Sequence, residues 1–242
     1  MLLHTRGIVF RAVKYGETSV IADIFTEEQG LHSFIAGSVR TAKSRMPYSL
    51  FQPMTVVDLV AYMKGQEGSL NRLKECRAGE VFTGIPFDIR RGAVALFMAE
   101  ICRKSIHEGE AQQDLFAFLL DQLLWLDTTP HPIANLHLHF LTHLSGFLGF
   151  QPGVEEEGEE LFFDLKEGAF SVVPPPHPLY LEVEDSARLI DLLSAPLQTA
   201  HEIPISRPQR KLLLQRMLQF YQMHLPGFTG VNTPDILEMV ME

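Results

Sequence analysis

Cationic side chains gather next to an aromatic ring in the segment from Gly37 to Leu50. Arg40, Lys43 and Arg45 lie there without any acidic residue, and Tyr48 follows closely. Proteins that bind single-stranded nucleic acid hold phosphates with such cations and stack bases on such rings. The composition alone is equally typical of an ordinary solvated loop. The surrounding elements must therefore decide between the two interpretations.

Further cations lie on the strands expected around this loop. Arg72, Lys74 and Arg77 form a second cluster on the last expected strand and its exit. Each Lys or Arg that meets a phosphate displaces a condensed counterion, which is the main source of affinity for nucleic acids. The predicted DNA-contacting residues are Arg6, Arg11, Lys14, Arg40, Lys43, Arg45, Tyr48, Arg72, Lys74 and Arg77.

Three histidines in one apolar segment offer a different chemistry. His139 and His143 are four residues apart, so a helix would place both on one face, and His137 lies close by. Such a pair is typical of metal ligands, but no HExxH motif accompanies it and the local sequence offers no third ligand. We interpret the three as histidines at the edge of a core. A metal-dependent hydrolase built on this helix is one alternative function, and an adaptor that binds only protein is another.

No catalytic motif stands out in the chain. It contains no GxxxxGK[ST] or GxGxxG loop and no serine nucleophile elbow. Cys76 and Cys102 lack the flanking residues of catalytic thiols, and two cysteines in 242 residues fit a reducing cytoplasm better than a secreted scaffold. The N-terminal residues do not have the pattern of a signal peptide, and no segment reads as a membrane span. We therefore expect a cytoplasmic protein that is not an enzyme and needs no cofactor.

The first 80 residues have the pattern of a small all-β unit, with short strand-like runs separated by turn residues. Runs of β-branched and aromatic residues alternate with glycine-containing breaks. Five short strands with one longer connection, residues 37–52, suit a Greek-key barrel of the oligonucleotide-binding (OB) type. An SH3-like barrel fits the strand count nearly as well. The expected strands are residues 8–13, 19–26, 31–36, 54–63 and 70–77.

From Ile85 onward the apolar residues recur every three or four positions, which predicts helices. Ser206 has the chemistry of an N-cap, with Pro208 in the first turn that follows. The fold class is thus α+β, with an OB barrel in residues 1–80 and a helical domain in residues 81–242. The expected helices cover residues 93–104, 115–126, 133–147, 184–193 and 206–225, and a short one begins at Pro234.

Residues 151–180 interrupt the helical pattern. An acidic run, EEEGEE at 155–160, and a proline-rich run, VVPPPHP at 172–178, flank a short apolar stretch. The pattern predicts an acidic loop, a small hairpin through residues 166–168 and a polyproline-like linker. The acidic run is an ordinary solvated loop, or else it repels DNA from the helical domain.

Charge is divided unevenly along the chain. Residues 1–80 hold 10 Lys and Arg against 8 Asp and Glu, whereas residues 81–242 hold 10 against 22. The formal net charges are therefore +2 and −12. An anionic partner should meet the first third of the chain, with few contacts and a strong dependence on salt.

Three segments resemble one known family. They are TRGIVFRAVKYGETSVIADIFTEEQG at 5–30, LFQPMTVVDLV at 50–60 and RKLLLQRMLQFYQMHLPGF at 210–228. The first contains a Tyr-Gly-Glu-x-Ser turn and a Phe-Thr-x-x-x-Gly pattern. Their order and spacing are similar to those of the RecO family of recombination mediators, and the resemblance covers both ends and the helical middle.

The resemblance implies a DNA-binding OB barrel followed by a helical domain without enzymatic activity. Such proteins bind single- and double-stranded DNA, anneal complementary strands and engage the acidic tail of the single-strand DNA-binding protein. With RecR they help RecA to load on coated DNA, so the implied location is cytoplasmic and associated with the nucleoid.

The tail would need an apolar groove with cations at its rim. The stripes Leu96–Ile101 and Ile133–Phe147 are candidate walls for it. The candidate cations are Arg103, Lys104, Arg207, Arg210 and Lys211.

One departure from the family concerns metal. Many members carry a four-cysteine zinc module after the third helix, which here falls within residues 154–178. That stretch contains no cysteine, so the zinc site does not carry over.

We therefore predict that the protein folds without metal. Structural zinc contributes on the order of 10 kcal/mol to folding, so a zinc-dependent domain unfolds when it is chelated. Dialysis against EDTA should leave the melting temperature unchanged in differential scanning calorimetry. A large fall that added zinc reverses would contradict this expectation.

Overall fold

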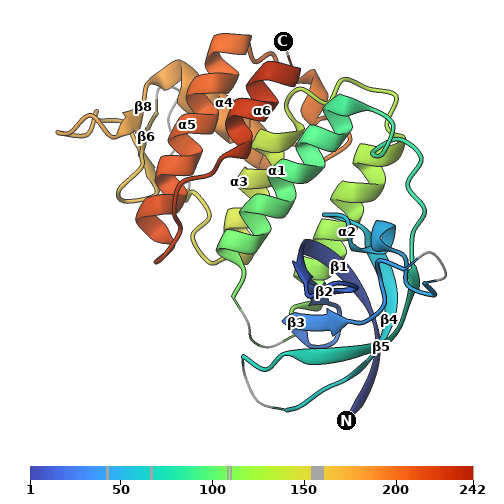
Figure 1. The fold of residues 1–242 in the computed structure, drawn as a ribbon. Helices are drawn as coiled ribbons and strands as arrows, with labels where there is room; N and C mark the ends of the chain where they lie inside the picture. Colours follow the sequence, from blue (N-terminus) through green and yellow to red (C-terminus); the bar gives the residue numbers. More distant parts are fainter. Residues whose placement is uncertain (42–43, 66–67, 108, 110, 154–160, 242) are drawn as a thin grey trace. The chain divides into compact units, whose positions relative to one another are not determined.

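The computed structural model describes residues 1–242 except 42–43, 66–67, 108, 110, 154–160 and 242. Contacts divide the chain into two compact units, Met1–Thr128 and Thr129–Glu242 (Figure 1). The first two helices thus belong to the same unit as the barrel, and the division near residue 80 stays a prediction. Within the described ranges, no helix is both long and apolar enough to cross a membrane.

Five strands form a closed barrel in the first unit, as predicted. Going round the barrel, their order is β1-β2-β3-β5-β4, and β3 and β5 run parallel whereas the other neighbours are antiparallel. In a simple meander β3 would lie beside β4, whereas here β5 lies between them, so this order defines the Greek-key barrel of the OB type. The strands are β1 (Leu2–Tyr15), β2 (Ser19–Thr26), β3 (Gly30–Ala36), β4 (Val56–Tyr62) and β5 (Asn71–Ala78).

Strand β1 is much longer than expected because it closes the barrel. Its first half, from Leu2 to Ile8, pairs with β4, and its second half, from Gly7 to Tyr15, pairs with β2. By contrast, β3 and β5 share only two registered residue pairs. We call this short junction the β3–β5 seam.

Aromatic rings connect the barrel to the helices of its unit. Phe10 stacks on Phe25 at 5.7 Å between ring centroids, and Phe25 lies 6.2 Å from Phe116 of α2. All three rings are buried, so α2 (Gln113–Thr128) covers the barrel there, and α1 (Ile89–Ser105) also packs against β1. The barrel and these two helices therefore share apolar contacts.

Asp127, near the end of α2, fixes the segment that leads from the barrel to α1. Its carboxylate accepts hydrogen bonds from the backbone N–H groups of Thr83, Gly84 and Ile85 at 2.7–2.9 Å. Burial raises the pKa of Asp127, but these bonds together outweigh it and hold the pKa below its usual value. Gly84 is required here because a Cβ would overlap the carbonyl oxygen of Asp127.

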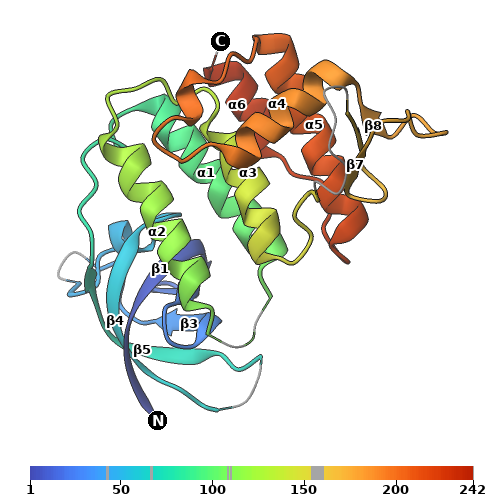
Figure 2. The same ribbon diagram turned by 180° about the vertical axis from the view of Figure 1, so that it is seen from behind.

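The described part of the second unit combines four α-helices with a small sheet. The sheet has the order β7-β6-β8, and its β6–β7 hairpin lies where the sequence predicted one. Strand β8 was not predicted, because two residues give no pattern. The acidic run 155–160 lies outside the described residues. The elements are α3 (Leu136–Phe147), β6 (Phe162–Asp164), β7 (Ala169–Ser171), β8 (Tyr180–Leu181), α4 (Val183–Ser194), α5 (Arg207–His224) and α6 (Thr233–Val240) (Figure 2).

Helix α5 begins at the predicted cap. Ser206 and Gln209 form a capping box, and Pro208 stands in the first turn. The hydroxyl of Tyr221 donates a hydrogen bond of 2.7 Å to the carbonyl of Leu141, which fixes α5 to α3. The sequence therefore predicts both the start of this helix and its apolar stripe.

The paired histidines of α3 cap α4. Nε2 of His139 donates to the carbonyl of Ala195 at 3.0 Å, and Nε2 of His143 donates to that of Leu192 at 3.1 Å. Burial, with His143 beside it, lowers the pKa of His139 to about 4, so its ring is neutral at pH 7. The described residues contain no cluster of three or more potential metal ligands. This geometry favours the interpretation as core-edge histidines over the hydrolase.

Replacing Asp127 with Ala should lower the free energy of unfolding of the first unit by about 2–4 kcal/mol, because three backbone N–H groups lose a charged acceptor. Trp125 is the single tryptophan and lies on the same helix, so its fluorescence in a urea titration measures this unit.

The matched control is Asp121→Ala, which removes an exposed carboxylate from the same helix and should change the midpoint little. Since the pKa of Asp127 is lowered in the fold, its contribution is present above the unfolded pKa and is lost as the pH falls through the folded value. Equal midpoints for the two variants would contradict the role of Asp127.

Candidate nucleic-acid interface and peptide groove

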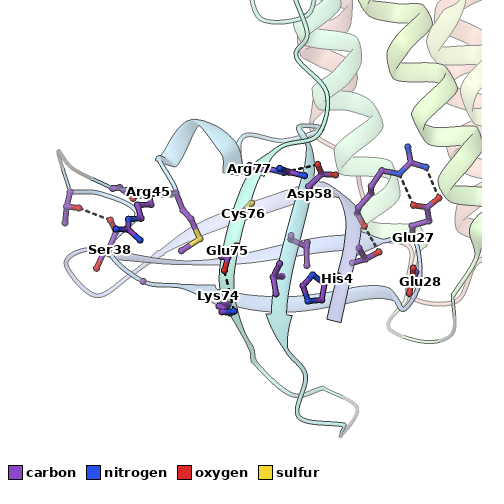
Figure 3. A pocket seen from close by; sticks show the side chains of 18 residues that line it. His4, Glu27, Glu28, Ser38, Arg45, Asp58, Lys74, Glu75, Cys76 and Arg77 are labelled. Carbon is purple, nitrogen blue, oxygen red and sulfur yellow. Dashed lines mark hydrogen bonds and ion pairs between the residues drawn. The ribbon is translucent and has the colours of Figure 1, made fainter. Parts of the chain in front are cut away.

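An open groove of about 1190 Å³ crosses the outer face of β1, β4 and β5 (Figure 3). The connection after β3 supplies one wall, with Ser38, Arg45 and Met46. Four predicted DNA-contacting residues line it: Arg6, Arg45, Lys74 and Arg77. The groove therefore brings together four of the ten predicted DNA-contacting residues.

Carboxylates neutralise most of these cations. Arg6 donates two hydrogen bonds of 2.8 Å to Glu27, and its guanidinium lies 5.4 Å from the centre of the Phe116 ring. The hydrogen bond with Glu27 raises the pKa of Arg6, while the same bond lowers that of the glutamate. Arg6 is consequently held within the protein by two partners.

Strand register neutralises Arg77, and the next residue in the chain neutralises Lys74. Asp58 of β4 pairs in register with Arg77 of β5, and their side chains form an ion pair of 3.2 Å. Lys74 lies 3.5 Å from Glu75. With Glu27, Glu28, Asp58 and Glu75 against four cations, the lining of the groove has a formal net charge of zero. Three of the four cations on this face are therefore already neutralised, and Arg45 is the exception.

Arg11 is also paired. Its Nε donates to Asp23 of β2 at 3.0 Å, and Ser33 of β3 donates to the other oxygen of that carboxylate at 2.8 Å. Arg11, Asp23 and Ser33 are neighbours in the register of the three strands. These residues are 10 to 12 positions apart in the sequence, so their spacing does not predict the network.

Four predicted cations, Lys14, Arg40, Arg45 and Arg72, have no carboxylate partner among the residues that the structure describes. All four are exposed, and we call them the cationic rim. Lys43 belongs to the same loop as Arg40 and Arg45 but lies outside the described residues.

The register places the rim around one region of the barrel. Arg72 pairs with Ile35 across the β3–β5 seam, and Ile35 pairs through Ile21 with Val13, the residue before Lys14. Arg40 is fastened to the β1–β2 turn, because its backbone N–H donates to the carbonyl of Thr18 at 3.1 Å. Arg45 lies beside Ser38 on the same loop (Figure 3).

Exposed tyrosines accompany the rim. Tyr15 follows Lys14 and is 52% exposed, and Tyr62, 51% exposed, is the register partner of Arg72. Tyr48, the predicted stacking residue, is 40% exposed. Neither Tyr15 nor Tyr62 is among the residues predicted from the sequence. Their outward position at strand ends was a signal that could have identified them.

A second hollow, of about 400 Å³, lies in the second unit beside α5. Three of the five predicted partner-binding cations, Arg207, Arg210 and Lys211, line it. Its apolar walls come from α5 and α6, with Ala134 and His137 at the start of α3. The apolar lining residues include Leu214, Leu218, Leu237 and Met241. We call this hollow the α5 groove.

The other candidates for this groove lie elsewhere. Arg103 and Lys104 stand at the end of α1 in the first unit, where Lys104 pairs with Glu100 at 3.6 Å. The stripes Leu96–Ile101 and Ile133–Phe147 supply mainly core residues instead of groove walls, because most of their apolar side chains are buried. Arg207, Arg210 and Lys211 are thus the predicted cations that the structure brings together.

A Greek-key barrel followed by a mostly helical region places the chain among proteins built on OB barrels. Comparison with known families narrows this class. Residues 1–82 match the family described as Recombination protein O N terminal, and residues 86–230 match Recombination protein O C terminal. The chain belongs to the RecO family, whose members are generally non-catalytic DNA repair proteins.

Curated relatives agree over their whole length. The chain is 35% identical over 243 residues to the DNA repair protein RecO of Bacteroides fragilis, with 100% of both chains covered. It is 34% identical to that of Phocaeicola vulgatus, with 98% of each covered, and 33% identical to that of Flavobacterium psychrophilum, with 99% of each covered. The resemblance inferred from the three segments is confirmed.

Proposed function

We propose that the chain acts as a recombination mediator that binds single- and double-stranded DNA through the cationic rim. The observation that supports this most is the separation of paired from unpaired cations on the barrel. Phosphates attract Lys and Arg that are not already neutralised, and three exposed tyrosines offer stacking platforms beside them. The four rim cations and Lys43 make five candidate phosphate contacts, a small number that agrees with the low positive charge of the barrel.

We also propose that the α5 groove takes the acidic, apolar-ended tail of the single-strand DNA-binding protein. Helix α5 holds four of the six Lys and Arg in residues 129–242 and no acidic residue. It is therefore a local basic surface in an acidic unit. Its leucines give the apolar end of a peptide a place to pack.

Together the two sites give a mechanism without catalysis. Capture of the tail would bring the barrel close to coated DNA, and the raised local concentration would let a weak rim compete for the strand. Binding of two strands in turn would promote annealing, and with RecR the chain would help RecA to load. This proposal places the chain in the cytoplasm, with the nucleoid.

The first test compares two double variants of equal net charge. Arg40→Gln with Arg72→Gln removes two unpaired cations, and each lost phosphate contact should flatten log affinity against log salt by about 0.7 for single strands. We therefore expect a change of roughly 1.4 in the slope, measured by fluorescence anisotropy with labelled single-stranded DNA.

The matched control is Arg11→Gln with Arg77→Gln, which removes two cations that already have carboxylate partners. Its slope should change by less than half as much. If both double variants lose the same slope, the cationic rim does not define the interface.

The second test concerns the α5 groove. The probe is a decapeptide with the sequence of the end of the acidic tail, called the tail decapeptide. Leu218→Ser should weaken its binding about tenfold by removing apolar contact, and Arg207→Gln should weaken it about threefold. Isothermal titration calorimetry with the full chain measures both. Arg216→Gln is the matched control, because Arg216 lies on α5 but outside the groove lining. Equal effects of Arg207→Gln and Arg216→Gln would indicate attraction to the helix charge without a defined groove.

A further inference from the structure

Helix α6 has the composition of the peptide that the α5 groove is proposed to bind. Its eight residues, TPDILEMV, contain two carboxylates, four large apolar side chains and no cation. It follows the segment that matches the family, which ends at residue 230. Asp235, Leu237 and Glu238 of α6 line the groove opposite α5.

The contacts of α6 repeat those expected of the tail. Glu238 forms an ion pair of 2.5 Å with Lys211, one of the cations predicted to receive the tail. Leu237, 2% exposed, also lines the groove. One acidic and one apolar contact thus occupy part of the surface that an incoming peptide would need.

This helix is also the kind that opens easily. It is eight residues long, and isolated helices of this length are not stable in water. Leu237 is its single fully buried residue, and both partners of the Lys211–Glu238 pair are about half exposed, where an ion pair stabilises weakly. Local unfolding of such a segment needs much less free energy than global unfolding.

We infer that α6 is an internal competitor, which covers part of the α5 groove and is displaced when an acidic, apolar-ended peptide binds. The inference rests on the proposed role of the groove and adds its regulation. When a site is open in only a fraction of molecules, its apparent dissociation constant is the intrinsic constant divided by that fraction. Weakening the hold of α6 should therefore strengthen peptide binding.

The test uses two full-length variants that leave the charge unchanged. Leu237→Ser removes the buried anchor, and Met239→Ser removes a side chain of the same helix that is 75% exposed. Calorimetric titration with the tail decapeptide should show about tenfold tighter binding for Leu237→Ser and no change for Met239→Ser. Binding by Leu237→Ser that is weaker than or equal to that of the unchanged chain would overturn the inference.

Hydrogen exchange on the unchanged chain gives a second result that does not depend on any variant. If the peptide displaces α6, the amides of residues 236–240 should exchange faster when the peptide is saturating. If α6 is instead a permanent wall of the groove, they should exchange more slowly or at the same rate, and the inference is then wrong.

The outcomes also separate the inference from the proposed function. Binding by the unchanged chain that is weakened by Leu218→Ser but not strengthened by Leu237→Ser rejects the internal competitor and keeps the groove. Absence of binding by both the unchanged chain and Leu237→Ser rejects the groove itself, and the competitor with it.

Discussion

Ion pairs within the barrel determine which of its cations are left without a carboxylate partner. Residues 1–80 hold 8 Asp and Glu against 10 Lys and Arg, so there are nearly enough carboxylates to neutralise the cations of the barrel. In the barrel, the register of antiparallel strands brings Asp58 to Arg77 and Asp23 to Arg11. The cations that remain unpaired are those on loops and strand ends, where the next strand offers no carboxylate. The small formal net charge of the barrel, +2, is therefore compatible with a local surface of unpaired cations.

The sequence predicts the elements of this fold better than their partners. Apolar periodicity, with Pro234 for the last one, indicates the six α-helices of the described residues, and Ser206 indicates a helix start, because these are local properties. The first half of β1 was missed, since His4, Thr5 and Arg6 do not look like strand residues until β4 is beside them. The pairing of Arg6 with Glu27 and the role of Asp127 depend on residues that are distant in the sequence, so no spacing rule could identify them.

The segment from the barrel to α1 is a rigid connection although it contains glycine and proline. Its backbone N–H groups at residues 83–85 are satisfied by a single carboxylate at the end of α2, and Arg91 of α1 donates to the carbonyl of Leu126 on the same helix. The two helices and the barrel are consequently coupled through one polar cluster. This explains why the contacts assign α1 and α2 to the unit of the barrel and not to the helices that follow.

The β3–β5 seam is the mechanical weak point of the barrel. The other strand pairs are held by six to eight registered residues, whereas this one has two, so the barrel should open first at this junction. Arg72 stands on one side of the junction and the loop of Arg40 continues from the strand on the other. A nucleic acid strand that contacts both Arg72 and Arg40 would hold the two sides of the seam together. If the cationic rim binds DNA as proposed, ligand binding and barrel closure are one equilibrium, in which the polyanion stabilises a junction that has few backbone pairs.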